Sequence, residues 1–94
     1  MSDTLSRLVM IEWVDSSQPE PAWKHFDDFP ELRIISCISV GWLVGKTDAI
    51  VMLAPNVADM DTENNAQASG FIRIPAASIT RTVDLVQVTV REVK

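Results

Sequence analysis

The sequence predicts a small, mainly β protein, a single strongly bent antiparallel β-barrel with one short helical turn. Valine and isoleucine together number 19, against six leucines, and β-branched side chains favour the pleated surface of a sheet. Short apolar runs alternate with turn-forming residues, a pattern typical of small barrels. The length of 94 residues fits one domain with a modest core.

The N-terminal part of the chain is predicted to contain a strand, a loop and a helical turn. Residues 7–14 are mostly aliphatic and divide between two faces, which indicates a strand. Residues 15–21 hold two prolines and two serines, so we expect a loop there. Residues 22–29 then form a helical turn, with Trp23 and Phe26 on one side, where they would cover the open end of the sheet.

The middle of the chain is predicted to form the longest strand and a hairpin. Residues 32–44 keep large apolar side chains in one alternating phase, and Gly41 within this run indicates a bulge or bend. Residues 45–48 form a tight turn, and residues 49–54 pair back onto the long strand. The letters GKT begin at Gly45, but a hairpin turn is favoured over a phosphate-binding loop because a strand follows rather than a helix.

After Pro55, the chain is predicted to hold a long loop and three further strands. Residues 56–70 are polar and without period, so we expect a long mobile loop. Residues 71–74 and 79–83 form short strands joined by a single 3₁₀ turn. Residues 85–94 alternate valine with polar residues and form a C-terminal edge strand.

The predicted core collects the apolar residues that share strand faces. Replacement of Ile38 or Trp42 by Ala should therefore cost about 2 to 5 kcal/mol. Such a loss is a large fraction of the stability of a small domain. The expected members are Val9, Ile11, Trp13, Ile38, Val40, Trp42, Val51, Leu53, Ile72, Ile74 and Ile79.

The order of these elements resembles the small barrels of the SH3-like and Sm-like kind, which end in a strand, a 3₁₀ turn and a strand. Four segments carry a second resemblance: IEWVDS at 11–16, GWLV at 41–44, LAP at 53–55 and IPAASI at 74–79. They are similar to segments of a group of small uncharacterised bacteriophage proteins. That resemblance implies a phage origin and binding rather than catalysis, and it assigns no functional residue. An anti-defence role is a further expectation.

Charge and hydropathy exclude several classes of protein. The net charge of −5 argues against extended nucleic acid as a partner, because neutralisation of phosphates needs a basic face. The longest uncharged stretch, residues 34–45, has 12 residues, whereas a membrane-spanning helix needs about 20. The N-terminus lacks the layout of a signal peptide. We therefore expect a cytoplasmic protein without a membrane partner.

The sequence predicts no catalytic site, metal site or cofactor. One cysteine and one histidine are too few for a zinc site with four Cys or His ligands. Asp59, Asp61 and Glu63 alternate as calcium ligands do, but the glycine and the last glutamate of an EF-hand loop are missing, which favours a solvated acidic loop. His25 has no nucleophile in its own segment and Cys37 has no basic neighbour, so we expect no enzyme activity.

The arginines are the most informative polar residues. Arg33, Arg73, Arg81 and Arg91 fall on predicted strands. Such residues usually form surface ion pairs, but if two or more converge they would clamp a phosphate or a carboxylate. Trp23 is the tryptophan least tied to a core face, and it would be free to stack on a base. The candidate site for a small anionic, nucleotide-like ligand therefore consists of Trp23, Arg33, Arg73 and Arg81.

Three functions remain open, and an enzyme ranks last because the sequence offers no convincing catalytic constellation. The first is a non-enzymatic, phage-type accessory protein that sequesters a small nucleotide-like anion or binds a host protein. The alternative is an acidic protein-interaction module, or an inhibitor that mimics nucleic acid, using acidic residues within 15–31 and 59–63. In both cases we expect a homo-oligomer, because one small barrel cannot bury all the apolar surface of a chain that is 47% hydrophobic. The interface is predicted at Val86, Val88 and Val90.

Overall fold

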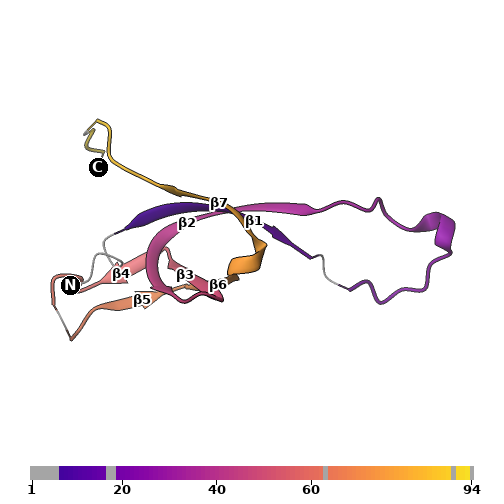
Figure 1. The fold of residues 1–94 in the computed structure, drawn as a ribbon, viewed down its shortest axis with the longest axis horizontal. Helices are drawn as coiled ribbons and strands as arrows, with labels where there is room; N and C mark the ends of the chain where they lie inside the picture. Colours follow the sequence, from indigo (N-terminus) through magenta and orange to yellow (C-terminus); the bar gives the residue numbers. More distant parts are fainter. Residues whose placement is uncertain (1–6, 17–18, 63, 90, 94) are drawn as a thin grey trace.

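The computed structural model describes residues 7–16, 19–62, 64–89 and 91–93. Within them, strands form a five-stranded antiparallel sheet and a separate two-stranded hairpin (Figure 1). The mainly β class predicted from the sequence is therefore confirmed. The strand order in the sheet is β6-β3-β2-β1-β7. In chain order the elements are β1 (Leu8–Asp15), η2 (Phe26–Asp28), β2 (Ile35–Lys46), β3 (Ile50–Ala54), β4 (Asn56–Ala58), β5 (Gln67–Ser69), β6 (Ile72–Pro75), η3 (Ala76–Ser78) and β7 (Ile79–Asp84).

The central strand of the sheet is β2, which pairs with β1 on one side and with β3 on the other. The register of the second pairing shifts between Leu43 and Gly45, at a bend where β2 turns into the second half of the sheet. Thr47 closes the turn to β3, because its Oγ1 accepts hydrogen bonds from the backbone nitrogens of Ala49 and Ile50. The hairpin turn that the sequence favours over a phosphate-binding loop is confirmed.

The two edge strands of the sheet, β6 and β7, follow each other in the chain. They pair with β3 and β1 respectively, yet only the three residues of η3 join them. Strands lie about 4.8 Å apart, so the edges of a flat five-stranded sheet would be about 19 Å apart. A 3₁₀ turn of this length spans about 6 Å. The sheet is therefore strongly curved, as the course of β2 in Figure 1 shows, although no β6–β7 pairing occurs among the described residues.

The core fills the inside of the curved sheet. Its buried side chains come from β1, β2, β3 and β6, and Trp13 and Ile79 pack against them. The indole nitrogen of Trp13 also donates a hydrogen bond to Ser39 Oγ, 3.0 Å away. Ile72, which the sequence predicts in this core, is partly exposed on the edge strand β6. The buried apolar residues are Val9, Ile11, Leu43, Val51, Leu53, Ala54 and Ile74.

The structure corrects the face that the sequence assigns to β2. The sequence predicts Ile38, Val40 and Trp42 in the core, but Ile38 is 65% exposed and Val40 is 54% exposed, while Trp42 is half-buried. In the observed register Val40 lies opposite Met10, and directly opposite residues share one face of a sheet. Val40 therefore lies on the outside with Met10, and not on the inside with Val9.

Small residues of β2 face the core instead. Gly41 lies opposite Val9, and Ser39 lies opposite Ile11. The cause is the close approach of β3, because a Cβ built on Gly41 would lie 3.0 Å from the carbonyl oxygen of Ala54. A large side chain does not fit inside this bend. The bend predicted at Gly41 is thus a place of close strand contact. Val40 and Trp42 lie on the outside next to it, whereas Leu43 is the large side chain of β2 that enters the core.

Three other segments differ from the prediction. Residues 56–70 are not one irregular loop, because β4 and β5 pair within them as a hairpin. The C-terminal tail, residues 85–89 and 91–93, is not in a strand, and the backbone nitrogen of Leu85 adds a hydrogen bond to the Leu8 carbonyl oxygen beyond the end of β7. The predicted helical turn is reduced to the three residues of η2.

In the described part of the chain, no helix has the length and apolar character needed to cross a membrane.

Candidate functional site

An arm, residues 19–34, projects from the ends of β1 and β2 away from the rest of the molecule (Figure 1). Every residue of the arm is exposed. The molecule measures 56 Å along its longest axis and 31 and 26 Å along the others, and the arm lies along the long one. At its far end is η2, where the rings of Phe26 and Phe29 are tilted against each other with centroids 5.1 Å apart.

Large apolar side chains of the arm contact water instead of a core. Trp23 is fully exposed, Leu32 is 97% exposed and Phe26 is 85% exposed. The prediction that Trp23 and Phe26 cover the open end of the sheet is therefore wrong. Clustered exposed aromatic and aliphatic side chains are typical of surfaces that bind another protein. A hollow of about 310 Å³ on the arm is lined by Glu20, Ala22, Trp23, Lys24, Phe26 and Phe29.

The arm is also acidic. It contains four acidic and two basic side chains, and one of the basic ones, Lys24, is paired with Glu20. Asp27 and Asp28 lie within η2, next to the phenylalanine rings. The arm thus presents apolar and negatively charged groups together. A complementary surface would be an apolar groove bordered by Lys or Arg side chains.

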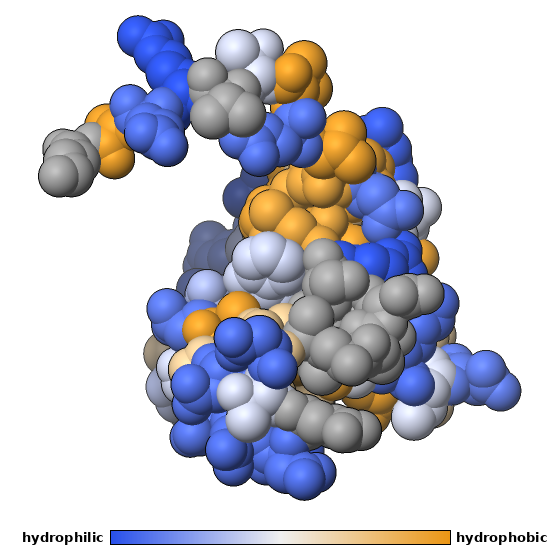
Figure 2. Space-filling view, turned by 90° about the vertical axis from the view of Figure 1, so that its left-hand side faces the viewer, coloured by the Kyte–Doolittle hydropathy of each residue, from blue (hydrophilic) through white to orange (hydrophobic). Residues whose placement is uncertain are grey.

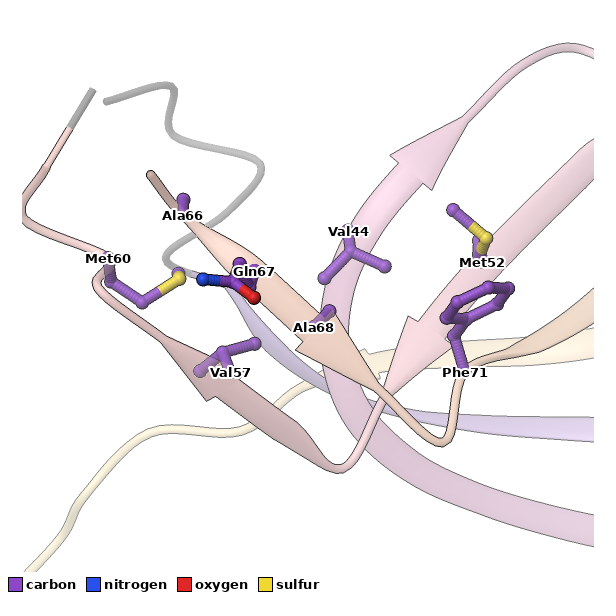
Figure 3. Close-up of a pocket in the computed structure, with 8 residues that line it drawn as sticks. All are labelled: Val44, Met52, Val57, Met60, Ala66, Gln67, Ala68 and Phe71. Atoms are coloured by element: carbon purple, nitrogen blue, oxygen red, sulfur yellow. The ribbon is translucent and has the colours of Figure 1, made fainter. Parts of the chain in front are cut away.

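A groove of about 280 Å³ between the sheet and the β4–β5 hairpin is a second candidate site (Figure 3). Val44 of β2 and Met52 of β3 lie on one side of it, and Val57 of β4 lies on the other. Arg73 lies over the ring of Phe71, with its guanidinium carbon 6.0 Å from the ring centroid. The complete lining is Val44, Met52, Val57, Met60, Ala66, Gln67, Ala68 and Phe71.

Sequence reasoning missed this groove for a structural reason. Most of its lining comes from residues 57–68, which the sequence analysis assigns to an irregular loop. Val57 and Ala68 are each half-buried between two exposed neighbours. This alternation of burial indicates two short strands. Strands of three residues are too short for such a signal to stand out from a loop.

The structure places the predicted anion-binding residues on three separate parts of the chain. Trp23 and Arg33 lie on the arm, and Arg33 precedes β2 instead of lying on a strand. Arg73 lies on β6 and Arg81 lies on β7, which are opposite edges in the strand order. Arg81 Nη1 is 3.7 Å from Glu12 Oε2. Arg81 thus forms a surface ion pair, the alternative that the sequence also allows.

The predicted interface residues lie on the C-terminal tail. Val86 is 79% exposed and Val88 is 91% exposed, whereas Val90 lies outside the described residues. Figure 2 shows the tail raised from the body of the molecule, with hydrophobic side chains gathered on the face below it. The exposed valines of the tail and the hydrophobic side chains of this face are therefore both in contact with water.

Polar clusters suited to metal binding are absent from the described residues, where no three His, Cys, Asp or Glu side chains gather. Cys37 is half-buried on β2 opposite Trp13, and His25 is exposed on the arm. The two residues therefore lie on different elements and do not form a catalytic pair.

No protein-family model, curated protein or solved structure matches this chain. The resemblance to bacteriophage proteins therefore stays a hypothesis.

Proposed function

We propose that this chain is a non-enzymatic binding protein that docks onto a partner protein through its arm. The observation that supports the proposal is the exposure of Trp23, Phe26 and Leu32 on one projecting segment. Tryptophan and other large side chains that insert into a partner's pocket commonly contribute most of the binding energy of an interface. Among the functions that the sequence leaves open, the proposal corresponds to an accessory protein that binds a host protein and to an acidic protein-interaction module.

Burial of the apolar side chains would supply the affinity of this contact. A large apolar side chain contributes about 1.5 to 3 kcal/mol when it moves from water into a fully buried site. The acidic side chains Asp27 and Asp28 would contribute mainly to the rate of association with a basic surface, and this effect falls as salt concentration rises. The expected partner is therefore a protein with an apolar groove and a basic border.

The curved sheet would hold the arm in place as a rigid support. Both ends of the arm continue into β1 and β2, which pair along the full length of β1. We propose that the sheet is a partly closed small barrel of the SH3-like or Sm-like kind, which the short η3 link between its edge strands supports. The cellular setting that fits the phage resemblance is a bacterial cytoplasm, with a host protein as the partner.

Photo-crosslinking in bacterial cells that express the chain tests the docking of the arm. A photo-reactive phenylalanine derivative in place of Trp23 is expected to crosslink one discrete foreign protein. The same derivative in place of Thr62, an exposed residue outside the arm, should not. The purified partner should bind the wild-type chain, and Leu32→Ala should weaken binding at least about tenfold. Thr62→Ala is the matched control.

Two results would contradict docking through the arm. The first is that residue 23 crosslinks only to other copies of the chain. The second is that Leu32→Ala and Thr62→Ala bind the purified partner equally well. Binding that does not weaken with added salt would contradict the contribution of the acidic side chains.

A second candidate function, capture of a small anion that carries a ring, is favoured by one observation. Arg73 lies over Phe71, and Phe71 lines the groove. A guanidinium at the border of an apolar groove suits a ligand with a planar ring and a phosphate. A thermal-shift screen with nucleotides and cyclic dinucleotides tests this function, because a ligand of the folded state raises the melting temperature. Arg73→Ala should abolish the shift.

A further inference from the structure

The outer face of the sheet is apolar across three neighbouring strands. Leu8 of β1 lies opposite Trp42 of β2, and Met10 of β1 lies between Val40 of β2 and Val83 of β7. We call these five residues the outer face. A sheet with one face in water normally alternates apolar and polar residues. Here both faces carry large apolar side chains: on the outer face Val40 is 54% exposed and the other four residues are half-buried.

The outer face carries almost no net charge. The next row of side chains places Glu12 between Ile38 and Arg81, and the carboxylate of Glu12 lies 3.7 Å from the guanidinium of Arg81. Two copies of a chain with net charge −5 can therefore bring these faces together without opposing like charges. The arm differs, because its four acidic and two basic side chains would place like charges against each other between two copies.

The exposed area of the chain is larger than a compact monomer has. Its accessible surface is 8060 Å², whereas a compact protein of 10.4 kDa exposes about 5,400 Å². The radius of gyration is 17.8 Å, against about 12 Å for a compact chain of this length. A standard interface buries about 800 Å² on each partner. The excess is thus large enough for a second copy as well as for a partner on the arm.

We propose that two copies of this chain associate through the outer face about a two-fold axis, with each C-terminal tail lying along the sheet of the other copy. A two-fold contact pairs the same residues of both chains, so a neutral apolar face is complementary to itself. The two sheets would stack about 10 Å apart with interdigitated side chains. This surface is separate from the arm, so the inference goes beyond the proposed function.

The C-terminal tail is continuous with the outer face. The backbone N–H of Leu85, the first residue after β7, donates a hydrogen bond to the carbonyl oxygen of Leu8. Leu8 belongs to the outer face. Val86 and Val88 follow at alternating, exposed positions. The arm begins at the opposite end of β1 and β2. Association through the outer face and tail would therefore leave the arm of each copy free.

Sedimentation velocity of the full-length chain over a micromolar concentration series tests this proposal. The wild-type chain is expected to be a dimer. Val40→Glu places two carboxylates near the two-fold axis and should raise the dimer dissociation constant at least roughly 100-fold. Leu32→Glu puts the same charge on an equally apolar but distant residue of the arm, and it should leave the dimer unchanged. Val88→Glu should weaken the dimer through the tail.

Controls separate dissociation from unfolding. Val40→Glu should keep the far-UV circular dichroism spectrum of the wild type, and Val83→Lys serves as a second variant of the outer face on another strand. A wild-type monomer over the whole series, or two outer-face variants that stay dimeric, would overturn the proposal. A dimer that dissociates with Leu32→Glu instead would overturn it and the foreign-partner docking of the arm together. Loss of arm crosslinking with the dimer intact would count against the proposed function alone.

Discussion

The backbone carbonyl oxygen of Ala54 lies 3.0 Å from the position that a Cβ on Gly41 would occupy. This contact joins the bend of β2 to the end of β3. Because the inside of the bend has no room for a larger side chain, the neighbouring residues Val40 and Trp42 lie on the outer face. Close packing on the inside of β2 and large apolar side chains on its outside thus occur at the same segment of the strand.

Gly41→Ala is expected to lower the free energy of unfolding by about 1 to 3 kcal/mol, the usual cost of overpacking. The added methyl group would meet backbone atoms of Ala54, which move only if β3 shifts. Gly45→Ala is the matched control, since its methyl group would meet the flexible end of the Met52 side chain at 3.3 Å. Urea unfolding followed by circular dichroism measures both variants. Equal losses would contradict the special role of the Gly41 contact.

Ser39→Ala is expected to reduce stability by about 1 kcal/mol, because the indole nitrogen of Trp13 loses its hydrogen-bond acceptor. Ser36→Ala changes an exposed serine of the same strand and should stay within about 0.5 kcal/mol of the wild type. A double-mutant cycle with Trp13→Phe isolates the bond between the two side chains. A coupling energy near zero would show that this bond does not stabilise the fold.

Ile11→Ala and Ile38→Ala test which face of the sheet holds the core. Ile11 is 1% exposed and Ile38 is 65% exposed. Ile11→Ala should cost about 2 to 5 kcal/mol, since it opens a cavity in the core. Ile38→Ala should cost less than about 1 kcal/mol. A larger loss for Ile38→Ala than for Ile11→Ala, measured by thermal unfolding, would restore the face that the sequence assigns to β2.

Trp23 should be the tryptophan most accessible to solvent in the chain alone. Acrylamide is expected to quench its fluorescence more steeply than that of Trp13 or Trp42, which are half-buried. Three variants that each retain one tryptophan, with phenylalanine at the other two positions, separate the signals. Equal protection of Trp23 and Trp13 would show that the arm folds back onto the sheet.

Local features of the sequence predict a large part of this fold correctly. Strand-forming residues predict β1, β3, β6 and β7, and Pro75 predicts the 3₁₀ turn before β7. The turn at Thr47 follows from the residues that form it. Core residues are also predicted correctly in β1, where Val9 and Ile11 are buried. These features depend on residues that are close together in the chain, so they can be predicted from the sequence alone.

The candidate sites were harder to predict, because they depend on contacts between distant segments. The groove needs the β4–β5 hairpin to lie beside Val44 and Met52. The sequence predicts that Trp23 and Phe26 cover the open end of the sheet, and these residues have the same apolar character whether they are covered or exposed. The local sequence around Trp23 does not indicate whether another part of the chain packs against this residue. Exposure of the arm is a property of the whole fold.

The sequence by itself determined the β class, the acidic charge and the turn between β2 and β3, because each of these follows from composition or from adjacent residues. Only the tertiary structure decided which face of β2 is inside. Ile38, Val40 and Trp42 share one alternating phase of β2, with Ser39 and Gly41 in the other, so the local pattern favours the face that the structure places outside. The choice depends on register, because a shift of one residue exchanges the two faces. Pairing with β1 and the close approach of Ala54 to Gly41 select the face with small residues for the interior.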